Sequence, residues 1–279
     1  MGEPMSAPGA VLRRPRAAAR RAPAARRPVR RLRQWARWHG RLRLAIALLA
    51  LAGLLVVANW LYHVARKPAE LVGLVAGPTP RAPRETWQAY GASFRAYSTD
   101  TMTPPLLAAL VQAESRGDAT ARTYWRWRWS GNPLEWYGPA SSAVGILQIT
   151  DGAFAEARRY CIHDHRVARA GAWTDPHACW FNSLYSRLIP SHAIEMTAAR
   201  LHQAVEDTLA ARGLRRVGLR ERQDLATVIH LCGAERGATF ARHGFRPVPD
   251  ERCGDHGLRE YLRQVRAHQA EFTRLEAAP

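Results

Sequence analysis

The longest apolar stretch of the chain lies near its N-terminus. Between Leu44 and Ala65 there is no Lys, Arg, Asp or Glu. A helix of about 20 apolar residues is long enough to cross a bilayer. The pattern therefore predicts one transmembrane helix over residues 44–65. A cleaved signal peptide is the alternative, because residues 56–58 would serve as a cleavage site.

A second apolar pattern predicts a short helix from Thr103 to Gly117. Thr103 suits the N-cap, two prolines suit the first turn, and Gly117 suits the stop. Three apolar positions recur at helical spacing on one face: Leu107, Leu110 and Val111. Glu114 is the next position on that face.

Glu114 is therefore a carboxylate on the apolar face of a helix, where a charged side chain is unusual. Burial disfavours the charged form and raises the pKa of a carboxyl group, which keeps a general acid protonated near neutral pH. The competing interpretation is a frayed helix end that lets Glu114 reach water.

The rest of the chain is predicted to be mainly α. Further helical patterns begin near Asp151, Ser191, Asp224 and Leu258, and the first is expected to continue through Tyr160. No βαβ alternation and no internal repeat is present, so the strand-like pieces suggest only a small β-hairpin.

Those pieces include an alternation of aromatic and basic residues with the period of a strand. Trp125, Trp127 and Trp129 alternate with Arg126 and Arg128. One interpretation is a flap over a cleft, with the Trp side chains stacked on sugar rings. A second is contact with a membrane surface, and a third is a lid of Trp side chains packed on the domain.

The net charge is distributed unevenly along the chain. The net charge is +18, of which residues 1–43 carry +12 and the remainder +6. This Arg-rich tail is predicted to be disordered and, by the positive-inside rule, cytoplasmic. Residues 66–85, rich in Pro and Gly, are expected to be a linker, and residues 86–279 the extracytoplasmic domain. Binding of nucleic acid by the tail is less favoured than this anchoring role.

The four cysteines follow the apolar stretch, where disulfides are reasonable. Neighbours in sequence suggest the pairs Cys161–Cys179 and Cys232–Cys253, one of three possible connectivities. A metal site is ranked below a disulfide, because the histidines near Cys161 and Cys179, including His177, fit no zinc spacing. No metal and no cofactor is expected.

The segments around Glu114 resemble a known enzyme family. Glu114-Ser115 is followed by Gly145-Ile146-Leu147-Gln148, and the chain here resembles the soluble lytic transglycosylase (SLT) domain, a relative of goose-type lysozyme, over roughly residues 95–270. The resemblance implies a lysozyme-like fold. His230-Leu231-Cys232-Gly233 stands where the family has Tyr-Asn-Ala-Gly, and Tyr261-Leu262 where it has Tyr-Val.

The resemblance implies cleavage of peptidoglycan between N-acetylmuramic acid and N-acetylglucosamine. Glu114 would act first as acid and then as base on the muramoyl O6 hydroxyl, which closes a 1,6-anhydro ring without water. No second carboxylate is then needed, unlike in ordinary glycosidases. Asp118, expected in a solvated loop, and Glu135 and Asp151 are expected not to be catalytic.

The same resemblance assigns supporting roles around Glu114. They fall to Ser115 by hydrogen bonding, to Gly145 and Gln148 as cleft residues, and to His230 and Tyr261 as groups within reach of the carboxylate. Ordinary alternatives are a helix-cap hydroxyl, a tight turn, an interior histidine and a core tyrosine.

The sequence thus predicts a peptidoglycan lytic transglycosylase anchored in the bacterial inner membrane, with a periplasmic catalytic domain. Such an anchor suits local opening of the wall for a secretion or conjugation machine. A goose-type muramidase that uses water, and a non-catalytic wall-binding scaffold with the same fold, are the alternatives.

Overall fold

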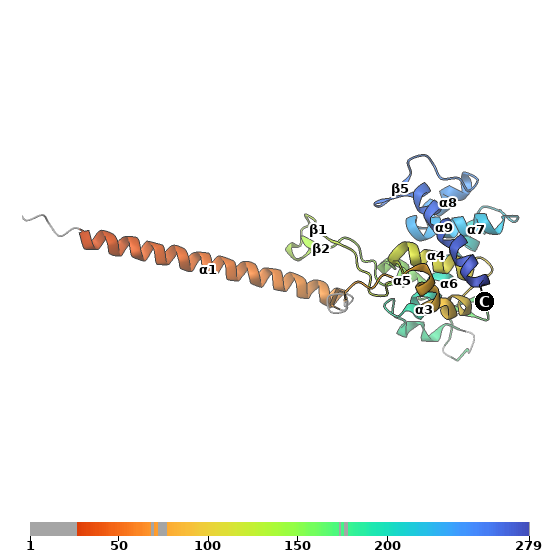
Figure 1. Ribbon diagram of the computed structural model, residues 1–279, viewed down its shortest axis with the longest axis horizontal. Coiled ribbons are helices and arrows are strands. Elements are labelled where there is room, and N and C mark those ends of the chain that lie inside the picture. Colours follow the sequence, from red (N-terminus) through yellow and green to blue (C-terminus); the bar gives the residue numbers. More distant parts are fainter. Residues whose placement is uncertain (1–26, 68–69, 72–76, 173, 176–177, 279) are drawn as a thin grey trace, which may run out of the picture. The chain divides into compact units, whose positions relative to one another are not determined.

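A computed structural model describes residues 27–67, 70–71, 77–172, 174–175 and 178–278, with side chains from residue 38 onwards (Figure 1). By its internal contacts the chain divides into two compact units, residues 1–55 and residues 56–279. The second unit contains the last turns of α1 and all of the elements that follow.

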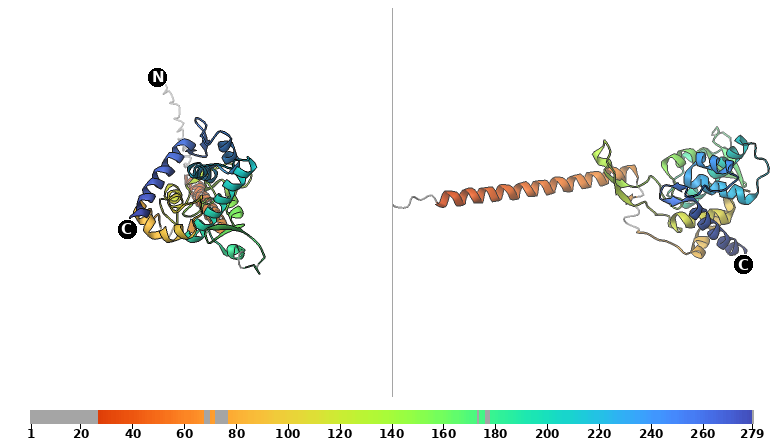
Figure 2. Two further views of the ribbon diagram at one scale, coloured as in Figure 1. Left: turned by 90° about the vertical axis from the view of Figure 1, so that its right-hand side faces the viewer. Right: turned by 90° about the horizontal axis from the view of Figure 1, so that it is seen from above.

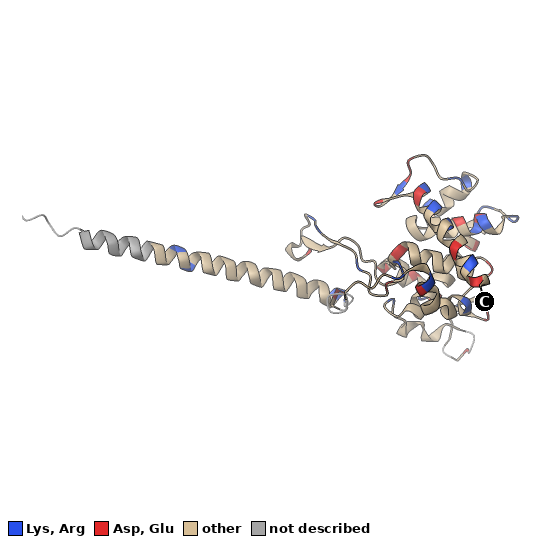
Figure 3. Cartoon of the chain, in the orientation of Figure 1, with Lys and Arg blue, Asp and Glu red and all other residues tan. Residues whose placement is uncertain are grey.

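Helix α1 is one continuous helix, Arg27–Arg66. Among the described residues, its stretch Trp38–Arg66 is long and apolar enough to cross a membrane. No Lys, Arg, Asp or Glu lies between Arg43 and Arg66, and Figure 3 shows most of this helix in tan. The predicted disorder of residues 1–43 is wrong for Arg27–Arg43, because Arg, Leu, Gln and Ala favour the continuation of a helix that the apolar stretch has nucleated. Residues 1–26 lie outside the described part.

The remaining elements confirm a mainly α chain. The helices are α3 (Pro83–Ala96), α4 (Pro104–Ser115), α5 (Asp151–Ala157), α6 (Pro190–Ala211), α7 (Leu219–Cys232), α8 (Ala234–Arg242) and α9 (Leu258–Ala277), with the short 3-10 helices η1 (Pro133–Glu135) and η2 (Trp180–Leu184). The strands are β1 (Trp125–Trp127), β2 (Tyr137–Pro139), β3 (Tyr160–His163), β4 (Arg166–Arg169), β5 (Arg252–Cys253) and β6 (His256–Gly257). They pair as three antiparallel hairpins, where the sequence predicted one.

The helix predicted to continue through Tyr160 instead ends at Ala157, and the chain turns into the hairpin β3–β4. Asp164 and His165 form its turn with positive φ angles of 48° and 63°. Two residues in the left-handed region match the twist of a hairpin, and the β-branched Ile162 and Val167 face each other across it.

Helix α4 lies at the centre of the hydrophobic core. Every residue from Pro105 to Gln112 is buried, and the helix packs against α3 and α9 (Figures 1 and 2). Arg116 and Gly117 end it in the left-handed region, with φ of 55° and 73°. A Cβ on Gly117 would lie 2.4 Å from the Thr86 hydroxyl of α3. This close approach fixes where α4 stops and where Glu114 emerges from the core.

Both predicted disulfides are confirmed. Cys161 in β3 is bonded to Cys179, and Cys232 at the end of α7 is bonded to Cys253 in β5. Among the described residues no group of His, Cys, Asp and Glu is arranged to hold a metal ion; His177 lies outside them.

Asp118 is buried, not solvated as the sequence suggested, with 4% of its surface exposed. Its carboxylate accepts hydrogen bonds from the backbone N–H and hydroxyl of both Thr79 and Thr120, at 2.8–3.1 Å. Burial raises the pKa of Asp118, but these four donors outweigh it and hold the pKa below its ordinary value. The buried carboxylate thus links the segment before α3 to the end of α4.

We expect Asp118→Asn to lower the free energy of unfolding at pH 7 by about 1–3 kcal/mol, because the amide cannot accept from all four donors. The pKa of Asp118 is lower in the folded chain than its ordinary value of 3.8, which applies to the unfolded chain. The carboxylate therefore stabilises the fold above pH 3.8, and this stabilisation is lost as the pH falls through the folded-state pKa. Urea unfolding against pH measures it. Asp164→Asn, in an exposed turn, is the control; an equal loss in both variants would contradict the prediction.

Candidate active site

Glu114 lies in the last turn of α4, with 16% of its side chain exposed. Its Oε1 accepts a hydrogen bond from the Tyr261 hydroxyl of α9, and Nε2 of His230 in α7 lies 3.4 Å from the same oxygen. Three helices that are distant in sequence therefore meet at one carboxylate oxygen. The helix end does not fray into water, because α9 and α7 cover it.

The electrostatic balance at Glu114 differs from the sequence prediction. Burial raises the pKa of Glu114, but the hydrogen bond and positive charge of His230, then the Tyr261 hydroxyl and the charge on His256, lower it below the ordinary value. Burial and the Glu114 charge raise the pKa of Tyr261 far above its usual range, so the hydroxyl remains a donor. The pocket thus favours the ionised carboxylate in the resting chain.

His230 is held at the C-terminal end of α7, and 8% of its side chain is exposed. Its Nδ1 is buried and has no hydrogen-bond partner among the described residues. The neighbouring Cys232 is linked to Cys253, in the hairpin that carries His256. Sequence reasoning did not identify His256, although two residues with turn chemistry, Gly254 and Asp255, lie directly before it.

The loop of residues 143–149, which contains the predicted cleft residues Gly145 and Gln148, closes on itself and against α4. Ser115 Oγ donates to the Ile146 carbonyl oxygen at 2.7 Å and to that of Val111 at 3.2 Å, so it connects the loop to the helix as well as capping a carbonyl of its own helix. The loop is further closed by the isolated bridge between Val144 and Ile149.

Gly145 and Gln148 both adopt positive φ angles, 77° and 45°. A Cβ on Gly145 would lie 2.2 Å from the carbonyl oxygen of Arg187, so only glycine fits there. Gln148 Nε2 donates to the Gly145 carbonyl at 2.8 Å and to the Ala121 carbonyl at 3.1 Å. A non-glycine residue in this region is strained and persists where its surroundings hold it.

Gln148 and His230 also line one small cavity of about 40 Å³, together with Ala157 of α5 and with Thr197 and Arg200 of α6. The structure therefore brings Ser115, Gly145, Gln148, His230 and Tyr261 around the end of α4, although they come from four different parts of the sequence.

The three predicted tryptophans lie elsewhere. Trp125 Nε1 donates to Glu70 Oε2 at 3.1 Å and its ring packs against His63, while Trp127 and Trp129 are 70% and 85% exposed. None of their described contacts involves Glu114, His230 or Tyr261. One link to the site exists at the base of this hairpin, where the Tyr124 hydroxyl donates to Asp255, the neighbour of His256.

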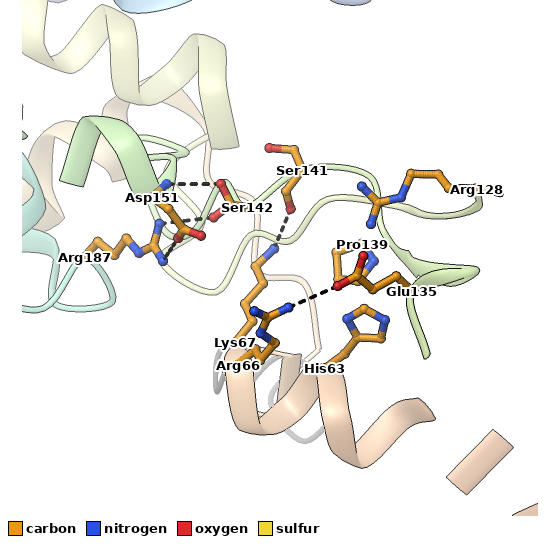
Figure 4. A pocket seen from close by; sticks show the side chains of 10 residues that line it. All are labelled: His63, Arg66, Lys67, Arg128, Glu135, Pro139, Ser141, Ser142, Asp151 and Arg187. Atoms are coloured by element: carbon orange, nitrogen blue, oxygen red, sulfur yellow. Dashed lines mark hydrogen bonds and ion pairs between the residues drawn. The ribbon is translucent and has the colours of Figure 1, made fainter. Parts of the chain in front are cut away.

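A larger cavity, of about 380 Å³, lies beside the hairpin (Figure 4). Its walls come from the end of α1, the hairpin and the loop 141–151, and two ion pairs cross it, Arg66–Glu135 and Arg187–Asp151. Lys67 Nζ lies 3.3 Å from the Ser141 carbonyl oxygen, and burial lowers the pKa of Lys67.

The three other carboxylates considered for catalysis are engaged away from Glu114. Asp118 is bonded to threonines, Glu135 pairs with Arg66, and Asp151 pairs with Arg187 at the start of α5. Within the described residues, the groups that contact the Glu114 carboxylate are thus Tyr261 and His230.

Comparison with protein-family models, with curated proteins and with solved structures finds no match to this chain.

We expect Gly145→Ala to destabilise the chain by about 1–3 kcal/mol, because the new methyl meets the Arg187 carbonyl and the φ angle is strained for alanine. Gly152→Ala is the matched control: a Cβ there meets nothing within 4 Å, and alanine favours the helix α5. Thermal unfolding of both variants distinguishes the two sites. A Gly145→Ala chain as stable as the control would show that the loop is free to adjust.

We expect His230→Gln to raise the pKa of Glu114, because the amide retains a donor and removes the positive charge. Titration of the carboxyl ¹³C signal in selectively labelled chain measures the pKa. His243→Gln, on an exposed histidine after α8, is the control. An unchanged Glu114 pKa in His230→Gln would contradict the role assigned here to His230.

Proposed function

We propose that this chain is a membrane-anchored lytic transglycosylase, which cleaves the β-1,4 bond between N-acetylmuramic acid and N-acetylglucosamine in peptidoglycan. The observation that carries the proposal is the single carboxylate of Glu114. It is partly buried at a helix end and contacted by Tyr261 and His230, beside the loop that Ser115 connects to the same helix.

Support also comes from the resemblance to the SLT family. Glu114-Ser115 and Gly145-Ile146-Leu147-Gln148 match its motifs, and Tyr261 stands where the family has a tyrosine. The contact between Tyr261 and Glu114 gives that tyrosine a physical role, namely to orient the carboxylate. His230, which replaces the family's Tyr, touches the same oxygen, so the substitution keeps a hydrogen-bonding group in place.

The reaction needs one group that gives a proton and then takes one. Protonated Glu114 donates to the glycosidic oxygen as the bond from that oxygen to C1 of the muramoyl residue breaks. The resulting carboxylate then removes the proton of the O6 hydroxyl, and O6 bonds to C1 to close the 1,6-anhydro ring. The proton returns to Glu114, and no water is consumed.

The lowered pKa of Glu114 has a consequence for this cycle. Only the protonated fraction can start the reaction, and this fraction falls as the pH rises through the pKa of Glu114. Activity is then highest at pH values below the pKa of Glu114. Loss of the His230 charge raises this pKa, so that activity declines at a higher pH. The ionised form that His230 and Tyr261 stabilise is the one required in the second step.

The anchor would be Trp38–Arg66 of α1. Arginines precede it in large excess, so the positive-inside rule puts the N-terminus in the cytoplasm and the catalytic domain in the periplasm. Cutting would then be confined to wall close to the inner membrane, which suits local clearance for a secretion or conjugation machine.

The test is digestion of purified peptidoglycan by the full chain in detergent, with mass spectrometry of the products. Wild type is expected to release 1,6-anhydromuropeptides, and Glu114→Gln to lower their rate by about 10²–10⁴-fold, because the amide cannot donate the proton. Glu135→Gln, a glutamate paired with Arg66, is the matched control and should retain activity.

Two outcomes would replace the proposal. Products with reducing ends would identify a goose-type muramidase that uses water, with the same acid. A folded chain that binds peptidoglycan and releases nothing would identify a wall-binding scaffold.

A further inference from the structure

The hairpin of residues 124–139, here called the Trp-Arg hairpin, is not used by the proposed reaction. Its strands β1 and β2 pair Trp127 with Tyr137, and their rings lie 5.0 Å apart. Beyond the strands, Trp129 contacts Trp136 edge to face at 5.1 Å. The result is a row of aromatic rings in which Trp127 and Trp129 are mostly exposed to solvent.

The Trp-Arg hairpin is fixed to the last turns of α1. Asn59 Nδ2 donates to the Leu134 carbonyl oxygen at 2.7 Å, and the Tyr62 hydroxyl donates to Glu135 Oε1 at 3.1 Å. At the other end of the hairpin, a Cβ on Gly138 would lie 2.5 Å from the His63 ring. Glycine therefore permits the close approach of strand β2 to the helix.

These contacts also give the hairpin a direction. Its tip, at Leu134, lies beside Asn59, while its base at Trp125 lies beside His63 and Glu70. The tip therefore points back along α1, towards the apolar turns where Val56 and Val57 are exposed. If those turns are in a bilayer, the tip is at the depth where a lipid headgroup layer begins.

The charges of the hairpin suit such a layer. Arg126 and Arg128 are exposed on the hairpin, and in the described part of the chain neither has a carboxylate within ion-pair distance. Arg66, with 65% of its side chain exposed and paired with Glu135, adds a basic group at the end of α1, along the wall of the adjoining cavity (Figure 4). Exposed Trp next to unpaired Arg is the composition that lies at a membrane interface.

We propose that the Trp-Arg hairpin is a second membrane contact, which inserts Trp127 and Trp129 among the headgroups of anionic phospholipids around α1. The proposal rests on the proposed anchoring by α1, but not on the proposed catalysis. It favours the membrane over the glycan as the partner of these tryptophans, because Leu134 and Glu135 near the tip are bonded to the end of α1, whereas the hydrogen bond towards the site comes from Tyr124 at the base. The domain is then held at the bilayer surface by two contacts.

The test uses the full chain in nanodiscs of phosphatidylglycerol and phosphatidylethanolamine, with and without acyl chains brominated near the headgroup. Because the chain has ten tryptophans, each signal is obtained as the difference between wild type and a Phe variant. The emission removed by Trp129→Phe is expected to be blue-shifted and quenched by brominated lipid. Trp180→Phe is the matched control: Trp180 is 45% exposed on η2, and the emission it removes should be insensitive to brominated lipid.

Three results would overturn the proposal. The first is Trp129 emission that aqueous iodide quenches and brominated lipid does not. The second is a Trp129 emission that shifts when soluble glycan fragments are added to the nanodiscs, which would make the hairpin a sugar platform. The third is extraction of the chain from the nanodiscs by alkaline carbonate, which would show that α1 does not anchor the chain in the bilayer. Release of anhydromuropeptides in detergent is measured separately, so failure of the anchor and failure of the catalysis remain distinguishable.

Discussion

One carboxylate oxygen determines how the helices of this domain have to be arranged. Oε1 of Glu114 is contacted by Tyr261 from α9 and by His230 from α7, and the helix that carries it is buried along most of its length. A charge in such a place is tolerated only where hydrogen bonds replace the water that it has lost. The positions of α7 and α9 relative to α4 are therefore part of the chemistry of the site, and the tight end of α4 against Thr86 determines how far the carboxylate emerges.

Several features of this arrangement were predictable from the sequence. Prolines after Thr103 and glycine at 117 located α4, and apolar spacing put Glu114 on its inner face. The pairing of neighbouring cysteines, one of three possible connectivities, was suggested by their order and is present in the structure. The contact of Tyr261 with Glu114 was expected from the family resemblance and is present in the structure.

Other features depend on distances that no local pattern encodes. The direction of the Glu114 pKa shift depends on a histidine 116 residues further along the chain, and periodicity does not place His230 or His256 within reach. The burial of Asp118 depends on Thr79, in a segment that composition marked as a linker. The place of the tryptophans was left open because alternation with period two defines a strand but not the surface on which it packs.

The disulfide Cys232–Cys253 also has a role beyond connecting two elements. It joins the end of the helix that carries His230 to the hairpin that carries His256, and both histidines act on the charge of Glu114. The disulfide thus tethers to each other the two segments whose histidines lower the pKa of Glu114. In a reducing compartment this covalent link would be absent, and the place of His256 relative to His230 would depend on non-covalent contacts alone.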